Sequence, residues 1–223
     1  MASDKRKPAR PGLSQDRVLH AALTLADEVG VESLSMRRLG EALGVQAMSL
    51  YKHVANKDDI LDGIVDLVIG QIAVPEINRN NPGDNWKRAM RRRAVSAHDT
   101  LLRHPWAPML LLSRVNVGPA SLRYVDATIG CLRNAGFSYA MADHAWNAID
   151  NHIYGFTLQK LNFPFQPEEY ATVAQSFLPQ IPAAQYPHLN GMAQQVIDGK
   201  HDGLADFDFG LNLILDGLER VLR

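Results

Sequence analysis

One segment constrains the fold more than any other: LGEALGVQAMSLYKHVANKDDIL, from Leu39 to Leu61. Its apolar helical spacing breaks at Gly44 and resumes at once. A helix-turn-helix needs a small residue where its two helices approach and a residue that tolerates positive φ in the turn. Gly40 and Gly44 meet these two needs. We therefore predict that the chain bends at Gly44 and directs a short polar helix outward.

The residues around the bend support this interpretation. Ser35 can cap the helix before it, and Asn56 can cap the helix after it, with two acidic residues in the first turn. A plainer alternative is that the two glycines only separate two packed helices. The apolar side chains expected to fill the wedge are Leu39, Leu43, Val45 and Leu50. The side chains expected to face outward are Gln46, Ala47, Met48, Ser49, Tyr51, Lys52 and His53.

Helical periodicity continues along the rest of the chain, and no alternating strand pattern interrupts it, so the sequence predicts an all-α fold. A proline-rich stretch, residues 179–191, is expected to be a loop. The expected helices cover about residues 14–29, 35–43, 46–52, 56–74, 84–103, 107–113, 119–134, 139–161, 167–178, 192–198 and 203–222.

The turn-rich segment PEINRNNPG, residues 75–83, is the expected domain boundary. Residues 1–13 are polar and basic and are expected to form a flexible arm. Residues 14–57 form the predicted three-helix DNA-binding domain, and residues 58–74 a connecting helix. Residues 75–223 form a larger helical domain.

Composition narrows the possible functions. The chain has 223 residues and a single cysteine, Cys131, so an intrachain disulfide and a cysteine-based metal site are excluded. Its apolar runs are too short to span a membrane and its start lacks the apolar core of a signal peptide, so we expect a cytoplasmic protein with no membrane partner. Residues 1–57 carry nine Lys or Arg against six Asp or Glu, which indicates a basic N-terminal module.

The segment VESLSMRRLGEALGVQAMSLYKHVANKDDILDGIV resembles the DNA-binding segment of the tetracycline-repressor family of transcriptional regulators. The family pattern is matched by Leu43-Gly44-Val45 and by Leu50-Tyr51-Lys52-His53-Val54-Ala55-Asn56-Lys57. The C-terminal segment FDFGLNLILDGLERVL resembles the last helix of the tetracycline-type branch. The resemblance implies a homodimeric repressor that places its third helices in successive major grooves of a palindromic operator. It also implies that residues 75–223 are the domain for ligand binding and dimerisation.

Family contacts transfer by position to Arg37, Ala47, Met48, Ser49, Tyr51, Lys52, His53 and Lys57. Several of these side chains, together with Gln46, have the chemistry to contact DNA. Arg37 can reach a phosphate or a guanine edge, and Gln46 and Ser49 can hydrogen-bond bases or backbone. Ala47 and Met48 depart from the tetracycline repressor itself and can pack on thymine methyl groups, although Met48 can equally pack on its own domain. The basic arm, with Lys5, Arg6, Lys7 and Arg10, either contacts DNA or is a solvated tail.

The last helix places apolar side chains along one stripe, with two glycines seven residues apart on another. The expected dimer interface consists of Gly210, Leu211, Ile214, Gly217 and Leu218. A pocket for a small, mostly apolar or aromatic inducer calls for aromatic side chains with interspersed polar groups. The candidates are His98, Leu102, Trp106, Met109, Trp146, Asp150, Ile153, Tyr154 and Gln159.

Tetracycline repressors bind their drug with magnesium through a histidine and a glutamate, and a loose match places Gln159 at the glutamate position. We therefore expect no metal, no cofactor and a ligand other than tetracycline. The sequence has no phosphate-binding glycine loop, nucleophile elbow or zinc-protease motif, so an enzyme is not expected. A ligand-independent DNA-binding protein and, behind it, an all-α enzyme remain the alternatives.

Overall fold

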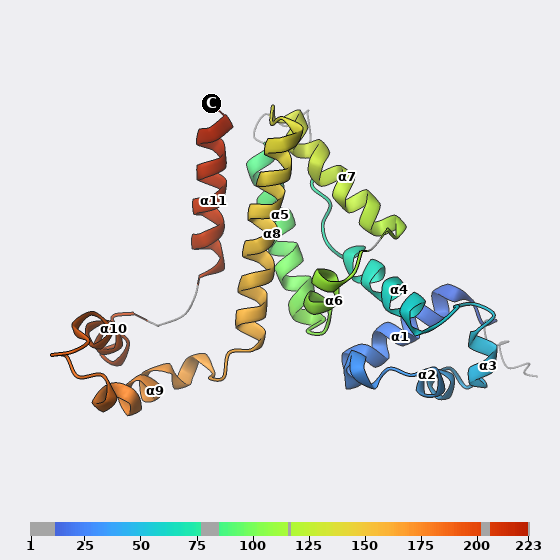
Figure 1. Ribbon diagram of the computed structural model, residues 1–223, viewed down its shortest axis with the longest axis horizontal. Coiled ribbons are helices and arrows are strands. Elements are labelled where there is room, and N and C mark those ends of the chain that lie inside the picture. The colour runs from blue at the N-terminus through green and yellow to red at the C-terminus, as the bar shows by residue number, and fades with distance from the viewer. Residues whose placement is uncertain (1–11, 77–84, 116, 202–205, 223) are drawn as a thin grey trace, which may run out of the picture. The chain divides into compact units, whose positions relative to one another are not determined.

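The computed structural model describes residues 12–76, 85–115, 117–201 and 206–222. Every regular element within these ranges is a helix, which confirms the all-α prediction (Figure 1). The chain divides into two compact units, residues 1–147 and 148–223, with the boundary inside α8, Tyr139–Leu161. The predicted basic arm lies almost entirely outside the described residues. None of the described helices is both long and apolar enough to cross a bilayer.

Four helices form the N-terminal head: α1 (Gln15–Val29), α2 (Met36–Leu43), α3 (Ala47–Leu50) and α4 (Lys57–Ile69). Three of them begin at a polar residue whose side-chain oxygen accepts a hydrogen bond from the amide three residues later. These caps are Ser14, Ser35 and Asn56, at 3.2, 3.3 and 2.8 Å. The head closes around side chains that are 0% exposed: Val18, Ala22, Leu39, Leu50 and Ile64.

The bend between α2 and α3 depends on both predicted glycines. Gly44 has a φ of 69°, the left-handed conformation expected of it. A Cβ placed on Gly40 would lie 2.9 Å from the carbonyl oxygen of Val45 and 3.2 Å from the amide nitrogen of Ala47. Backbone from the far side of the turn therefore occupies the space that any other residue would need.

Three further helices complete the first unit before α8: α5 (Trp86–Arg103), α6 (Ala107–Ser113) and α7 (Pro119–Asn134). Arg93 on α5 is 0% exposed and its guanidinium carbon lies 4.9 Å from the centre of the Tyr124 ring on α7. The Trp86 and Phe137 rings meet edge to face, with centroids 5.1 Å apart. Aromatic side chains thus help to hold α5 against α7 and the turn that follows α7.

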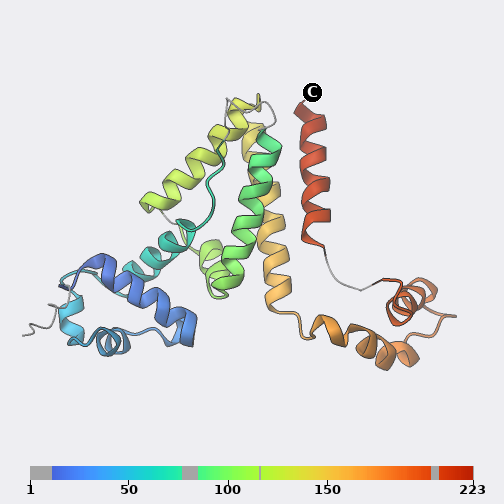
Figure 2. The same cartoon turned by 180° about the vertical axis from the view of Figure 1, so that it is seen from behind.

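The second unit contains the end of α8 and three further helices: α9 (Tyr170–Phe177), α10 (Pro187–Ile197) and α11 (Phe207–Leu222). Single 3-10 turns, Pro167–Glu169 and Leu178–Gln180, flank α9. Figure 2 shows α9 and α10 packed against each other as a hairpin.

Four predicted boundaries are wrong. The last helix, expected from residue 203, begins at Phe207. The helix expected at 192–198 begins earlier, because α10 starts at Pro187 inside the expected loop, where proline is tolerated in the first helical turn. The third helix is shorter than residues 46–52, since it ends at Leu50 and the chain continues as a turn. The connecting helix α4 ends at Ile69 rather than continuing to residue 74.

Candidate nucleic-acid interface and ligand cavity

Four of the seven side chains expected to face outward around the short helix α3 are exposed: Gln46, Met48, Tyr51 and Lys52. Met48 is 72% exposed and Tyr51 is 47% exposed, while Leu50 between them is 0% exposed and anchors the helix in the core. Of the other predicted contact residues, Gln46 and Lys52 are exposed, and Ala47, Ser49 and His53 are half-buried. The exposure of Met48 argues against its packing on its own domain.

Two predicted contacts flank α3. Arg37 on α2 is exposed, with its Nε 3.8 Å from Oε1 of Glu41, a surface pair that restrains the side chain only weakly. Lys57 is exposed at the first residue of α4. The Asp59 amide already donates to Asn56, and Asp59 itself accepts from the amide of Ala55 at 2.9 Å. A phosphate at this end of α4 would therefore be bound mainly by the Lys57 side chain, because these amides already have partners.

A set of hydrogen-bonded side chains, here called the Asp27 group, connects the head to the corner between α5 and α6. Its members are Asp27, Gln71, His104 and Trp106. Asp27 on α1 accepts a hydrogen bond from Trp106 Nε1 at 2.7 Å, and the same oxygen lies 2.8 Å from Nδ1 of His104. The other ring nitrogen of His104 lies 3.2 Å from Oε1 of Gln71, just beyond α4. Trp106 also packs against the apolar core of the head.

An acidic stripe on α4, formed by Asp58, Asp62 and Asp66, makes a second connection. These residues are four apart and therefore share one face of the helix. Arg114, in the linker between α6 and α7, donates to Oδ1 of Asp62 at 2.6 Å and to Oδ1 of Asp58 at 3.2 Å. The bond to Asp62 raises the pKa of Arg114 above its ordinary value, because it stabilises the charged guanidinium.

Asp66 caps the start of α7 from outside that helix. Its carboxylate accepts hydrogen bonds from the amides of Ala120 and Ser121, at 3.1 and 2.8 Å, and from the Ser121 hydroxyl at 2.7 Å. A carboxylate at a helix N-terminus is favoured by the unpaired amides there and by the helix dipole. The N-cap residue is Gly118, and a Cβ on it would lie 2.3 Å from Cγ of Asp66. The contact therefore requires glycine at this position.

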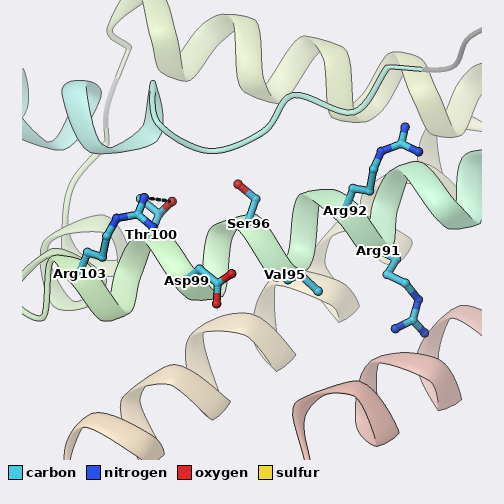
Figure 3. A pocket seen from close by; sticks show the side chains of 7 residues that line it. All are labelled: Arg91, Arg92, Val95, Ser96, Asp99, Thr100 and Arg103. Atoms are coloured by element: carbon cyan, nitrogen blue, oxygen red, sulfur yellow. Dashed lines mark hydrogen bonds between the residues drawn. The ribbon is translucent and has the colours of Figure 1, made fainter.

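A groove of about 450 Å³ runs along α5 (Figure 3). Its lining residues are Arg91, Arg92, Val95, Ser96, Asp99, Thr100 and Arg103. None of them is among the pocket residues predicted from sequence. A signal is nevertheless present, because positions 92, 96, 100 and 103 recur at helical spacing and carry only arginine, serine or threonine. Aromatic character, on which the predicted pocket depends, does not detect such a polar stripe.

The predicted pocket residues are divided between the two units. Trp106 donates a hydrogen bond to Asp27 and packs on the core of the head. Met109 on α6 is 60% exposed. His98 is buried and Leu102 half-buried on α5, and Trp146 is half-buried at the end of the first unit. The second unit holds the others: Asp150, Ile153, Tyr154 and Gln159. Among the described residues, no three His, Cys, Asp or Glu side chains are grouped so that they could hold a metal ion.

On α11 the side chains predicted for the dimer interface differ in exposure. Leu211 is 0% exposed, and a Cβ on Gly210 would lie 2.5 Å from the His152 ring, so neither position presents a free surface. A Cβ on Gly217 would meet nothing within 4 Å. Ile214 and Leu218 are half-buried. The exposed apolar side chains of this helix are instead Phe209, Leu213 and Val221, at 65%, 60% and 64%.

Comparison with known proteins assigns both parts of the chain. Residues 18–64 match the family described as bacterial regulatory proteins of the tetR family, and residues 79–222 match the tetracyclin repressor-like C-terminal domain. An HTH-type transcriptional regulator of Saccharopolyspora erythraea is 33% identical over 96% of this chain and 88% of its own length. The HTH-type transcriptional repressor DrrR1 of Streptomyces coeruleorubidus is 31% identical over 96% and 81%.

Solved structures support the same family. The TetR family protein ActR of Streptomyces coelicolor, in complex with actinorhodin, superposes with a TM-score of 0.78 at 28% identity, covering 95% of this chain and 99% of that chain. Two kinds of observation lead to one assignment. The structure exposes α3 after a glycine bend, and the family matches cover residues 18–64 and 79–222. The chain belongs to the tetR family of bacterial transcriptional regulators, with a tetracycline repressor-like C-terminal domain.

Proposed function

We propose that this regulator is a repressor that binds a palindromic operator as a homodimer and is released by a small, mostly apolar or aromatic molecule. The observation that carries the proposal is the outward face of α3, held by a fully buried Leu50. The proposed DNA-contacting residues are Arg37, Gln46, Ala47, Met48, Ser49, Tyr51, Lys52, His53 and Lys57. Relatives with matching length are named transcriptional regulators and repressors, which supports the same function.

The exposed side chains divide into two roles. Tyr51 and Lys57 present a hydroxyl and an ammonium suited to phosphate oxygens, which position the protein without reading sequence. Met48 and Ser49 lie on α3 itself, where an apolar contact with a thymine methyl or a hydrogen bond to a base edge discriminates between base pairs. Changing the first pair should weaken binding to all sequences, and changing the second should alter sequence preference.

The test begins with duplexes selected from a random pool by the wild-type protein. Lys57→Ala should weaken binding to all selected sequences and lower the slope of log affinity against log salt by about one. Lys160→Ala, an equal charge change on the exposed end of α8, is the control and should leave both quantities unchanged. Equal affinities and slopes for Lys57→Ala and wild type would show that the DNA-reading surface lies elsewhere.

For the dimer we propose the exposed face of α11. Phe209, Leu213, Gly217 and Val221 are four residues apart and form one ridge, and Gly217 allows a neighbouring helix to approach closely. Ile214 and Leu218 lie beside this ridge. A palindromic operator requires a two-fold symmetric protein, and a second copy supplies the same ridge. Leu213→Glu should shift sedimentation from dimer to monomer, whereas Asn212→Glu beside it should not.

Release requires that ligand binding in the body alters the head. The Asp27 group and the acidic stripe of α4 connect the head to α5, α6 and α7, so a ligand that moves these helices also moves α4. A tenfold loss of operator affinity needs only about 1.4 kcal/mol of coupling. ActR, a structural neighbour, binds actinorhodin. Among the sequence candidates, His98 and Leu102 lie on α5, one of the helices connected to the head.

A further inference from the structure

A methionine thioether lies open to solvent on the surface proposed to bind DNA. Met48 on α3 is 72% exposed, and Leu50, which is 0% exposed, fixes the direction in which α3 faces. Met36, the other methionine among the described residues of the head, is half-buried and packs against its core. An oxidant in solution therefore reaches the sulfur of Met48 more readily than that of Met36.

Sulfur-containing side chains of the body differ from Met48 in exposure or in place. Cys131 on α7 is 4% exposed, which shields its thiol from oxidants in solution, and Met90 on α5 is 0% exposed. Met109 on α6 and Met192 on α10 are 60% and 58% exposed, but they lie on helices outside the head. Met48 thus combines an accessible sulfur with a place in the proposed operator contact.

A methionine thioether is oxidised by two electrons to a sulfoxide. The sulfur lone pair attacks the terminal oxygen of a hydroperoxide, so that a sulfur–oxygen bond forms while the oxygen–oxygen bond breaks. The proton of that terminal oxygen moves to the leaving oxygen, which departs as an alcohol, or as water when hydrogen peroxide is the oxidant. The product carries a polar, chiral group in place of an apolar one, and its oxygen accepts hydrogen bonds.

A sulfoxide at position 48 suits the proposed DNA contact poorly. A thymine methyl group has no hydrogen-bond donor, so the sulfoxide oxygen would lose water on binding without gaining a partner. Neighbouring phosphate oxygens are acceptors as well and carry negative charge. Because Met48 is exposed, its oxidation leaves the core of the head intact, and the cost is confined to the complex with DNA.

We propose that Met48 is an oxidation site through which hydroperoxides weaken operator binding, and that reduction of the sulfoxide restores it. The proposal rests on the proposed function, because it requires α3 to face the bases. It adds a covalent modification of α3 that acts without any ligand in the body. Bound operator should cover Met48 and slow its oxidation, whereas Met109 should be oxidised at the same rate with and without DNA.

The test treats the full-length protein with hydrogen peroxide and measures the sulfoxide fraction at each methionine by peptide mass spectrometry. Operator affinity, measured by gel shift, should fall about tenfold as the sulfoxide fraction at position 48 approaches completion. Methionine sulfoxide reductases supplied with a dithiol should restore it. Each variant is assayed on duplexes that it selects itself. The quantity compared is the ratio of its affinities before and after oxidation, so that a change in basal affinity cancels.

Two variants separate Met48 from the other exposed methionines. Met48→Leu keeps an apolar side chain without sulfur, so oxidation should leave its affinity unchanged. The double variant Met109→Leu/Met192→Leu removes two comparably exposed thioethers and keeps Met48, so it should lose as much affinity as wild type.

Four results would each overturn the proposal: Met48 that stays reduced while Met109 is oxidised, sulfoxide at position 48 with unchanged operator affinity, an equal loss in Met48→Leu, or full protection by the double variant. A reduced protein that selects no duplex at all would instead overturn the proposed function, and this proposal with it. The two failures are distinguishable, because the first concerns the oxidised protein and the second the protein before oxidation.

Discussion

The head and the α9–α10 hairpin are both built from helices alone, yet they bury their side chains very differently. In the head, Val18, Leu39 and Ile64 are 0% exposed. Neither α9 nor α10 contains a buried residue, and Phe177 and Met192 are 47% and 58% exposed. Helices therefore form in both regions, but only the head encloses a core.

The difference shows that helix formation and cooperative stability have separate causes. Caps and spacing decide where a helix starts and ends, while burial of apolar surface decides how much free energy resists its opening. Segments with few buried contacts open locally at low cost. We therefore expect mutations of matched chemistry to have large effects in the head and small effects in the hairpin.

The largest expected effect comes from truncating a core leucine. Leu50→Ala should lower the free energy of unfolding by about 3 kcal/mol, because it leaves a cavity behind α3. Leu189→Ala on α10, where the leucine is 48% exposed, should change it by less than about 1 kcal/mol. Urea unfolding followed by circular dichroism measures both. Similar losses for the two variants would mean that the hairpin is buried in the working protein.

A glycine pair sharpens the same comparison with changes of opposite sign. Gly40→Ala should destabilise the head by about 2 kcal/mol, since its Cβ would lie 2.9 Å from the carbonyl oxygen of Val45. Gly191→Ala, inside α10 with nothing within 4 Å, should stabilise its helix by about 0.5–1 kcal/mol. Thermal melting resolves the two signs. A stabilising Gly40→Ala would contradict the tight bend between α2 and α3.

A smaller effect tests whether the contact between α4 and the start of α7 adds to stability. Asp66→Asn keeps the shape of the side chain but removes the charge that caps α7, and should cost about 1 kcal/mol. Asp126→Asn, an exposed carboxylate within α7, serves as the matched control and should cost little. Hydrogen exchange at the start of α7 should increase in the first variant alone. Unchanged hydrogen exchange at the start of α7 would show that Asp66 does not stabilise that end of the helix.

Local chemistry made much of the fold predictable. The spacing of Gly40 and Gly44 predicts the bend, and helical periodicity predicts the bounds of α6, α7 and α8 as the structure has them. These features depend on contacts within a few residues. The start of α10 is not predicted, because three nearby prolines indicate a loop, although Pro187 occupies the first helical position, where a missing amide costs nothing.

The long-range contacts of the body are harder to predict because the partners are distant in sequence. Trp106 has the character of a pocket aromatic, but its partner Asp27 lies 79 residues away. Arg92 and Ser96 hold a connector 16 and 23 residues before them. Periodicity places a side chain on a helix face, yet it does not say which other helix meets that face.

Helix α4 has a consequence for exchanging parts between related regulators. Ile60 and Ile64 belong to the core of the head, whereas Asp62 and Asp66 bind the linker and the start of α7. A chimera joined before α4 separates the first pair from its packing partners, and one joined after it separates the second pair from its hydrogen-bond partners. A working chimera must therefore carry over a whole set of matched residues on one side of this helix, so the modules are less interchangeable than their sequence boundary suggests.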